Sequence, residues 1–363
     1  LKPFWLKRLP SARLQIPSLA VISRQGLKMA EFKVCVCGGA GGIGQPLCLF
    51  LAMNEYVSEL CIYDLDVAMV PANGVATDLS HIEKSVKVKA YTLSKDEKPI
   101  HHLGECLTGC DLVLIPAGLP RKPGMSRADL LGVNGGIAKG IVEACGKYCP
   151  NAVLGLIVNP VNSVVPAMCE LYKRKGLNPK KICGVTTLDC VRANKFVHEI
   201  TGIDLDDINV PVVCGHSGAT IVPLFSQDPS CREVAPDMIA ALDRRVQAAG
   251  DEVVNAKDGK GSATLSMAYA GARFASAVLA GLAGEKDIRQ CAYVMSDVVP
   301  EVPYFASLVT FGREGVDFVH PIGDLSEHEQ ERMREATEQL KEEIKAGLDY
   351  AKSQVFFMID VRR

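Results

Sequence analysis

His216 is the side chain of this sequence best placed to transfer a proton. In the stretch "VVCGHSGAT" it follows a strand-like run and stands between Gly215 and Gly218, so that backbone can approach its ring in a cleft. A candidate partner lies in "GVTTLDCVRAN", where Asp189 and Arg192 are three residues apart on one side of a predicted helical turn. A histidine oriented by a carboxylate can exchange a proton with an alcohol while a cofactor takes the hydride. Because a single histidine is more often a packed or surface residue, this interpretation depends on Asp189.

A glycine-rich turn provides the second chemical signal. The stretch "CGGAGGIG" places Gly38, Gly41 and Gly44 between a predicted strand and a predicted helix. Glycines there let a pyrophosphate approach the backbone and face the helix N-terminus. Asp64 ends the next strand-like run, where a carboxylate can bind ribose hydroxyls and repel a 2′-phosphate. The pattern predicts NAD rather than NADP; the alternative is a structural turn with an unrelated surface aspartate.

A cationic loop is the third feature. The stretch "LPRKPGMSRADL" carries Arg121, Lys122 and Arg127 among two prolines and a glycine, a composition too broken for a helix or a central strand. Such cations are usually solvated. A binding role for them requires an anionic ligand and a reactive site nearby.

The composition is that of an ordinary globular enzyme. The 363 residues are 48% hydrophobic and 23% charged, with a formal net charge of −2. We expect no nucleic-acid partner from this charge, and no membrane association because no uncharged apolar run is long enough to cross a bilayer.

The cysteines indicate a reducing compartment. The fourteen cysteines are scattered, often inside apolar segments, as small core residues would be. Neither Cys106 with Cys110 nor Cys145 with Cys149 has the spacing of a convincing zinc site, so we expect no metal.

The elements that must position these residues follow a regular order. From Phe32 onward, strand-like runs such as "FKVCVC", "ELCIYD" and "DLVLIPAG" alternate with helical segments, which predicts a parallel sheet with helices on both faces. Near Thr186 the pattern changes to long helices mixed with strands, so a second domain is expected to begin there. From Ser326 a capping box opens a predicted surface helix with apolar Met333, Leu340 and Ile344.

Residues 1–28 differ from the rest of the chain. They contain six Lys or Arg residues and no Asp or Glu, a composition typical of an organelle transit peptide. We therefore expect a location in the mitochondrial matrix. The alternative is a start at Met29 and a cytoplasmic protein.

Taken together, the motifs resemble one family. The chain is similar to the mitochondrial and bacterial group of malate dehydrogenases, within the lactate/malate dehydrogenase family, from about Phe32 almost to the C-terminus. The motifs that carry the resemblance are "GGAGGIGQPL", "AGLPRKPGMSRADLL", "VNPVNS", "TTLDCVRAN", "GHSGATIVP" and "KGSATLSMAYAGARF".

The resemblance implies an α/β fold: a Rossmann-type doubly wound parallel sheet that binds NAD, followed by a mixed α/β catalytic domain. It also implies a homodimer and reversible oxidation of (S)-malate to oxaloacetate. The expected boundaries are 1–28 for an N-terminal extension, 29–185 for the NAD-binding domain and 186–363 for the catalytic domain.

The resemblance also implies roles for individual residues. His216 would be the general acid/base, and Asp189 would orient it. The implied substrate-binding residues are Arg121, Arg127, Asn159 and Arg192. The implied cofactor-binding residues are Gly38, Gly41, Gly42, Ile43, Gly44, Asp64, Asn134, Ile157, Asn159 and Met267. The sequence departs from the family pattern after Asn134, where Gly135 and Gly136 replace less flexible small residues.

Two alternatives remain open at this point. One is a lactate or aromatic 2-hydroxy-acid dehydrogenase, which would share the cofactor site and the His–Asp pair. Arg121 disfavours it, because a buried arginine facing the methyl group of lactate would lack a partner. The other is a catalytically silent NAD-binding protein, which would not need His216, Asp189 and the arginines together.

Overall fold

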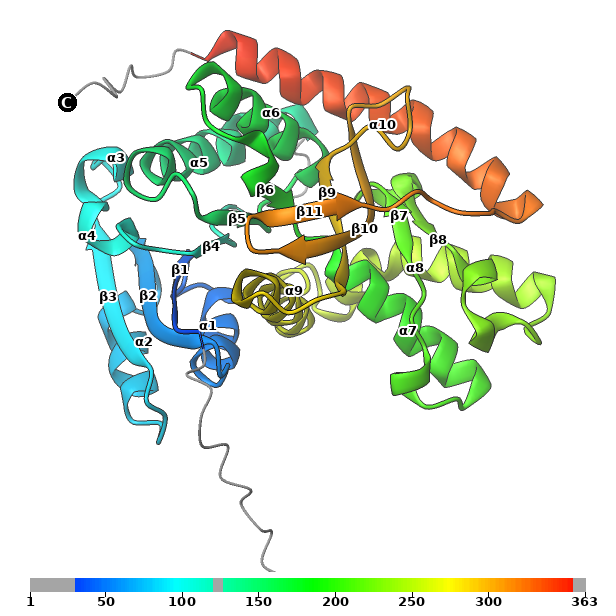
Figure 1. The fold of residues 1–363 in the computed structure, drawn as a ribbon, viewed down its shortest axis with the longest axis horizontal. Coiled ribbons are helices and arrows are strands. Elements are labelled where there is room, and N and C mark those ends of the chain that lie inside the picture. The colour runs from blue at the N-terminus through cyan, green and yellow to red at the C-terminus, as the bar shows by residue number, and fades with distance from the viewer. Residues whose placement is uncertain (1–29, 120–126, 355–363) are drawn as a thin grey trace, which may run out of the picture.

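One continuous sheet organises the protein, and it has eleven strands in the described part of the chain. The computed structural model describes residues 30–119 and 127–354. Ten strands follow the order β3-β2-β1-β4-β5-β6-β9-β10-β7-β8, and β11 pairs with β10. Helices cover both faces of this sheet (Figure 1).

The first half of the sheet is parallel. Its strands are β1 (Phe32–Cys37), β2 (Val57–Leu65), β3 (Lys87–Leu93), β4 (Leu112–Ile115), β5 (Val153–Leu156) and β6 (Ile182–Gly184). Neighbouring pairs among them are parallel throughout, and the order reverses at β1, as in a doubly wound fold. The helices of this half are α1 (Gly44–Ala52), α2 (Ala72–Ser80), α3 (Pro99–His102), α4 (Gly104–Leu107), α5 (Arg127–Tyr148) and α6 (Val161–Arg174). The predicted parallel sheet is confirmed.

The second half adds antiparallel strands to the same sheet. They are β7 (Val212–Cys214), β8 (Ile221–Pro223), β9 (Ile288–Met295), β10 (Tyr304–Gly312) and β11 (Gly315–Val319). The two halves join where β6 pairs with β9 through Gly184 and Tyr293. The helices of this half are α7 (Thr187–Thr201), α8 (Pro236–Ala256), α9 (Leu265–Ala283) and α10 (Glu327–Ser353). Short 3-10 turns occupy Pro179–Lys181, Leu205–Asp207, Gly218–Thr220, Phe225–Gln227 and Pro229–Cys231.

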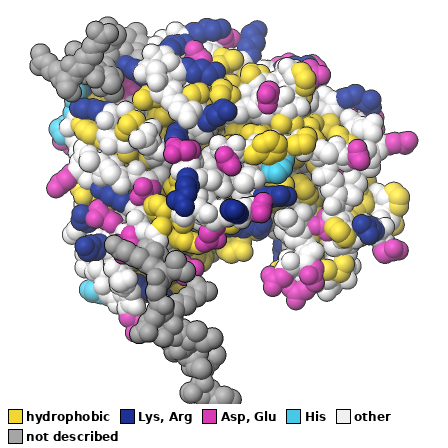
Figure 2. Space-filling model, viewed as in Figure 1, with side chains coloured by type: hydrophobic (Ala, Val, Ile, Leu, Met, Phe, Trp, Pro, Cys, Tyr) yellow, Lys and Arg dark blue, Asp and Glu magenta, His cyan; other side chains and the backbone are white. Residues whose placement is uncertain are grey.

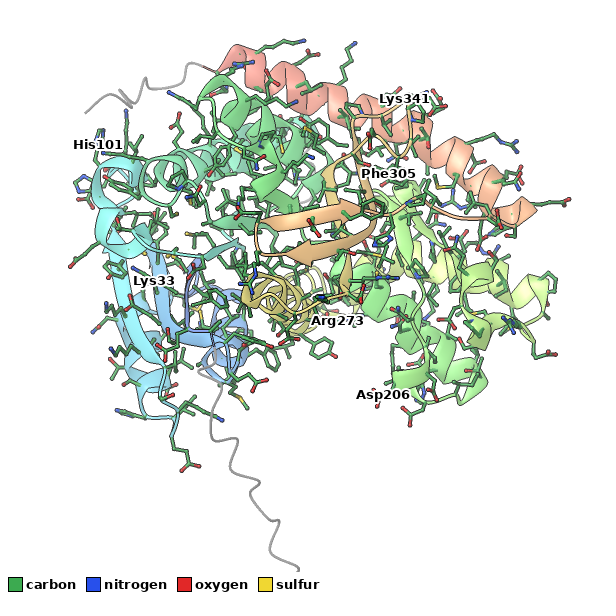
Figure 3. All side chains as sticks on the ribbon, viewed as in Figure 1. Lys33, His101, Asp206, Arg273, Phe305 and Lys341 are labelled. Carbon is green, nitrogen blue, oxygen red and sulfur yellow. The ribbon has the colours of Figure 1, made fainter. Side chains whose placement is uncertain are left out.

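Alternating side chains of β1 build two separate cores. Val34 and Val36 belong to the core beneath α1, α2 and α9, whereas Cys35 and Cys37 belong to the core beneath α5, α6 and α10. All four are fully buried, as expected for a central parallel strand covered on both faces. Figure 3 shows how side chains fill these layers, with Phe305 of β10 labelled at a fully buried position.

All fourteen cysteines are buried free thiols. Cys35 lies with its Sγ 3.4 Å from that of Cys106 and 3.8 Å from that of Cys37. Burial raises the pKa of Cys183 to about 12, so this thiol is protonated at neutral pH. In residues 30–119 and 127–354, no group of three or more His, Cys, Asp or Glu side chains could hold a metal ion.

Helix α9 is long and apolar enough to cross a bilayer by length and composition alone. It instead packs between α1, α7 and the strands β9 and β10, and about half of its apolar window is buried inside the protein. Its hydropathy therefore reflects its position in the core. On the face shown in Figure 2, positive and negative side chains are interspersed.

Helix α10 crosses the outside of α6 along one edge of the molecule (Figure 1). The predicted capping box is present: Ser326 and Glu329 bond each other's backbone N–H groups at 3.3 and 2.8 Å. Met333, Leu340 and Ile344 are buried as expected. The crossing is close, since a Cβ atom added to Gly347 would lie 2.1 Å from the carbonyl oxygen of Ser163.

We predict that Gly347→Ala lowers the free energy of unfolding by about 2 kcal/mol or more, because two backbones would have to separate to admit the methyl group. Gly250→Ala is the matched control in the interior of α8, where an added Cβ meets nothing within 4 Å. The control should be neutral or stabilising by about 0.5–1 kcal/mol. Urea denaturation measures both; equal stability of the two variants would contradict the close crossing.

Candidate active site

Asp189 and His216 are in contact, near the point where the two halves of the protein join. Asp189 lies in the first turn of α7, and His216 lies between β7 and the turn at Gly218–Thr220. The ring Nδ1 of His216 is 2.5 Å from Oδ2 of Asp189. The Asp189 side chain is 0% exposed and that of His216 is 13% exposed. The structure therefore brings together the two residues that the sequence analysis paired.

The short contact defines how His216 can act. A carboxylate accepts hydrogen bonds and cannot donate them, so the ring donates from Nδ1. The neutral ring then carries its lone pair on Nε2, which can accept a proton from a substrate alcohol. The position of Asp189 in the first turn of a helix favours its negative charge.

Arg192 lies beside the same carboxylate. Its Nη1 is 3.8 Å from Oδ1 of Asp189, one turn earlier in α7, and its side chain is 13% exposed. Burial lowers the pKa of this guanidinium, and the charge of Asp189 opposes that shift. Oδ1 of Asp189 is buried and accepts no hydrogen bond from the described residues. Arg192 therefore supplies nearby positive charge to a carboxylate oxygen that lacks a closer partner.

The backbone beneath His216 is tightly built. Cys214 has a φ of 77°, and the N–H of His216 donates to Oδ1 of Asn162 at 2.9 Å. A Cβ on Gly215 would lie 2.5 Å from Oγ1 of Thr220 and 2.7 Å from Nδ2 of Asn162. Glycine is thus required next to His216 because two polar side chains occupy the space of a methyl group. Asn162 was not predicted from the sequence, although it is the second asparagine of "VNPVNS".

The glycine-rich turn forms a cradle at the other end of the site. Gly38 has a φ of 96°, and its N–H and that of Gly39 donate to the carbonyl of Tyr63. A Cβ on Gly44 would lie only 2.1 Å from the carbonyl oxygen of Gly38. Helix α1 begins at Gly44, and Ile43 before it provides no side-chain cap. The N–H of Gln45 already donates to the carbonyl of Gly41 at 3.0 Å. The positive end of the helix dipole lies at the glycine-rich turn, which fits a bound pyrophosphate.

Asp64 is attached to this cradle. Its Oδ2 accepts the N–H of Ala40 at 2.9 Å, and its Oδ1 accepts the N–H of Leu65 at 2.8 Å. Each carboxylate oxygen can accept a further hydrogen bond, so ribose hydroxyls remain compatible with this arrangement. Asp64 thus also holds the glycine-rich turn, a contact that the sequence analysis did not predict.

The side chain of Asn134 connects two loops at the ends of the central strands. It donates to the carbonyls of Asn159 at 2.7 Å and Leu119 at 3.1 Å, and it accepts the N–H of Leu119 at 2.8 Å. Its neighbour Gly135 leaves room for Tyr350, whose ring would be 2.8 Å from an added Cβ. The unusual glycine therefore allows α10 to pack closely on α5.

Only some of the other predicted positions have described side chains. Ile157 and Met267 are buried, Asn159 is exposed, and an added Cβ on Gly42 would be 3.3 Å from Cγ2 of Thr264. Arg127 begins α5, but its side chain lies outside the described residues. Arg121 also lies outside them.

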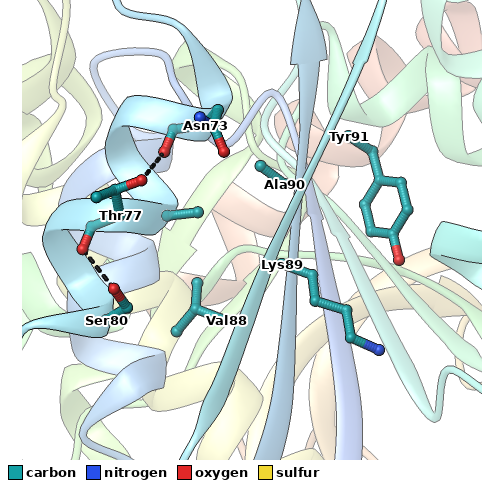
Figure 4. A pocket seen from close by; sticks show the side chains of 8 residues that line it. Asn73, Thr77, Ser80, Val88, Lys89, Ala90 and Tyr91 are labelled. Carbon is teal, nitrogen blue, oxygen red and sulfur yellow. Dashed lines mark hydrogen bonds between the residues drawn. The ribbon is translucent and has the colours of Figure 1, made fainter.

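A groove of about 360 Å³ lies elsewhere, between α2 and the edge strand β3 (Figure 4). The hydroxyls of Thr77 and Ser80 on its wall donate to carbonyls of α2, at 2.8 and 2.6 Å. Lys89 pairs with Glu59 at 3.0 Å. None of the candidate site residues lines this groove, so the groove is separate from the candidate active site.

Comparison with known proteins places this geometry in a family. Residues 32–184 match the "lactate/malate dehydrogenase, NAD binding domain", and residues 186–351 match the "lactate/malate dehydrogenase, alpha/beta C-terminal domain". The chain belongs to the lactate/malate dehydrogenase family. The family resemblance and the NAD cofactor expected from the sequence are both confirmed.

Individual relatives match this chain over most of its length and most of their own. Mitochondrial malate dehydrogenase of Eucalyptus gunnii is 48% identical over 88% of this chain and 90% of its own. Peroxisomal malate dehydrogenase 1 of Arabidopsis thaliana is 49% identical over 88% of both chains. The crystal structure of Cryptosporidium parvum malate dehydrogenase superposes with a TM-score of 0.74 at 26% identity, covering 88% of this chain and 99% of that chain.

We predict that Asp64→Asn raises the KM for NADH about tenfold or more and narrows the preference for NADH over NADPH. The change removes the charge that is expected to bind ribose hydroxyls and repel a 2′-phosphate. It also turns an N–H donor toward a backbone N–H. Asp66→Asn, at an exposed position two residues later, is the matched control and should match the wild type. An unchanged cofactor preference in Asp64→Asn would contradict the assignment.

Proposed function

We propose that this protein is an NAD-dependent malate dehydrogenase, which catalyses the reversible oxidation of (S)-malate by NAD⁺ to oxaloacetate, NADH and a proton. The observation that carries the proposal is the 2.5 Å contact between a fully buried Asp189 and His216. Relatives of nearly the same length, such as the one from Eucalyptus gunnii, are named malate dehydrogenases.

In the proposed mechanism His216 removes the proton of the substrate hydroxyl. Asp189 holds Nδ1–H, so that Nε2 of the ring faces the alcohol as a base. The glycine-rich turn and Asp64 would hold NAD⁺, which would accept the hydride. The imidazolium that forms is stabilised by the carboxylate of Asp189. In the reverse direction His216 returns the proton to the oxygen of oxaloacetate.

Arginines are proposed to bind the two carboxylates of the substrate. Arg192 would bind the carboxylate next to the reacting carbon, since it lies beside the His216–Asp189 pair and a guanidinium binds a carboxylate through two parallel hydrogen bonds. Arg121, which precedes α5 in the sequence, and Arg127, the first residue of α5, would also bind the substrate. Asn159 would donate to the reacting oxygen. Asn134, Ile157 and Met267 would line the nicotinamide side of the cofactor.

A homodimer is also part of the proposal. Leu49 and Phe50 of α1 are exposed, as is Met53 directly after it. Leu265 and Tyr269 of α9 are exposed as well. The rings of Phe50 and Tyr269 are in edge-to-face contact, with centroids 6.3 Å apart, so these side chains belong to one apolar face. A second copy of the chain would cover this face.

The proposed location is the mitochondrial matrix, with residues 1–28 as a transit peptide. It rests on the cationic composition of these residues, which lie outside the described part, and on relatives that are named mitochondrial. Peroxisomal relatives exist as well, and a start at Met29 would favour the cytoplasm. We further propose that 29–185 and 186–363 act as the cofactor and catalytic domains.

The substrate is tested by measuring NADH oxidation with oxaloacetate and with pyruvate in parallel. We predict rapid turnover of oxaloacetate and little turnover of pyruvate. Arg121→Gln should lower kcat/KM for oxaloacetate about a hundredfold or more and leave the low value for pyruvate nearly unchanged, because only oxaloacetate has the second carboxylate. Lys122→Gln is the adjacent control.

Three outcomes would overturn this proposal. Equal losses on both substrates in Arg121→Gln, or a preference of the wild type for pyruvate, would favour a lactate-type specificity. No turnover of either substrate, with NAD binding intact, would favour a silent NAD-binding protein.

A further inference from the structure

Glu343 of α10 reaches the loop that carries His216. Its carboxylate accepts the hydroxyl of Ser217 at 2.7 Å to Oε2 and 2.9 Å to Oε1. Oε2 also accepts from Nδ2 of Asn162 at 2.7 Å. Ser217 is the residue after His216, and Asn162 is the residue that holds the His216 backbone. One carboxylate thus bonds both side chains that flank the proposed base.

Glu343 is itself fixed in this position. Nε2 of Gln339, one turn earlier in α10, donates to its Oε1 at 2.8 Å. The backbone carbonyl of Glu343 accepts the hydroxyl of Ser163 at 2.7 Å. Because Gly347 allows α10 to approach Ser163 closely, the helix backbone and the carboxylate are both held against the start of α6.

Asn162 transmits this contact to His216. Asn162 is 1% exposed. The two hydrogens of its Nδ2 are shared among three acceptors: Oε2 of Glu343 at 2.7 Å, Oγ1 of Thr220 at 3.1 Å and Oγ of Ser217 at 3.2 Å. Because Nδ2 of Asn162 faces these acceptors, its Oδ1 points at the N–H of His216. The amide orientation follows from the negative partner, since a carboxylate at Glu343 can only face the NH₂ side.

Helix α10 holds the continuation of the same loop at a second place. Nη2 of Arg332 donates to the carbonyls of Ala219 at 3.0 Å and Ile221 at 3.4 Å, and Nε of Arg332 bonds Asp243 of α8 at 2.9 Å. The loop from Ser217 to Ile221 is therefore attached to α10 by a carboxylate at one end and a guanidinium at the other.

We propose that Glu343 is a positioning residue for the proposed dehydrogenase reaction, which sets the orientation of His216 through Asn162 and Ser217. Its carboxylate bonds Asn162 and Ser217, and through them it acts on the backbone of His216. Its contribution is to hold the backbone of His216 in a fixed position. The ring is then placed so that Nδ1 reaches Asp189 and Nε2 faces the substrate. The inference rests on the proposed function where it concerns the reaction rate. The expected effect of Glu343 on the tautomer of the His216 ring does not depend on that function.

The test compares Glu343→Ala and Glu343→Gln with Glu342→Ala, a control at the adjacent exposed position of α10. We expect Glu343→Ala to lower kcat for oxaloacetate ten- to a hundredfold, with the Kd for NADH within twofold of the wild type. Glu343→Gln keeps the shape and one acceptor oxygen, so it should recover part of the lost rate. Glu342→Ala should match the wild type.

A double-mutant cycle with Ser217→Ala identifies the route of the effect. If Glu343 acts through this hydroxyl and Asn162, adding Ser217→Ala to Glu343→Ala should lower kcat by less than Ser217→Ala does alone. Fully additive losses would overturn the proposed route.

A second readout is independent of turnover. In ¹⁵N-histidine NMR spectra, with the His216 signal assigned by its loss in His216→Asn, the wild type should show one Nδ1–H tautomer. Glu343→Ala should show a mixture of tautomers. A wild-type protein that shows the single tautomer but does not reduce oxaloacetate would refute the proposed function and leave the positioning role standing.

Two results would overturn the positioning role itself. One is an unchanged kcat and tautomer in Glu343→Ala. The other is a loss of kcat matched by an equal loss of NADH affinity, with the tautomer unchanged, which would indicate a general structural defect.

Discussion

The arrangement of the site depends on burying the carboxylate of Asp189. An isolated charge in a protein interior is strongly unfavourable, so a fully buried carboxylate must be compensated by hydrogen bonds, opposite charge or a helix N-terminus. All three contribute here: Nδ1–H of His216, the guanidinium of Arg192 and the first turn of α7. His216 therefore stabilises the buried charge of Asp189, and Asp189 in turn fixes the ring of His216. The contact between Asp189 and His216 thus compensates the buried charge of Asp189. It also places the lone pair of the ring on Nε2, where it can accept a proton.

This local arrangement requires several distant segments to meet. The β6–β9 pairing joins the parallel half of the sheet to the antiparallel half, and only two residues separate the end of β6 from the start of α7. His216 follows β7, which reaches the sheet by pairing with β10. Asn162 follows β5 and connects the His216 loop to the cofactor half. A shift of any of these strands would change the distance between His216 and Asp189.

Patterns among neighbouring residues were sufficient to predict the parallel strands and the capping box at Ser326. They also predicted the glycine-rich turn and the position of Asp64 at the end of the next strand. These features depend on residues close together in the sequence or on strand alternation. The pairing of Asp189 with His216 was predicted because both lie in distinctive motifs, and the structure brings them together.

The polar contacts between distant elements were not predicted. Glu343 bonds Asn162 across 181 residues of sequence, and in the sequence it is one of several charged residues on an amphipathic helix. Its hydrogen bonds to Asn162 and Ser217 show that this carboxylate faces inward. Asn134 likewise holds two loops by its side chain, which spacing alone does not reveal.

The most direct test of the central claim is the kcat of Asp189→Asn with oxaloacetate and NADH, measured beside NADH binding and thermal unfolding. If the buried carboxylate orients His216 and stabilises its imidazolium, kcat should fall roughly 10²- to 10⁴-fold. The Kd for NADH should stay near that of the wild type, and the protein should remain folded. A folded Asp189→Asn protein with a kcat within twofold of the wild type would contradict the account.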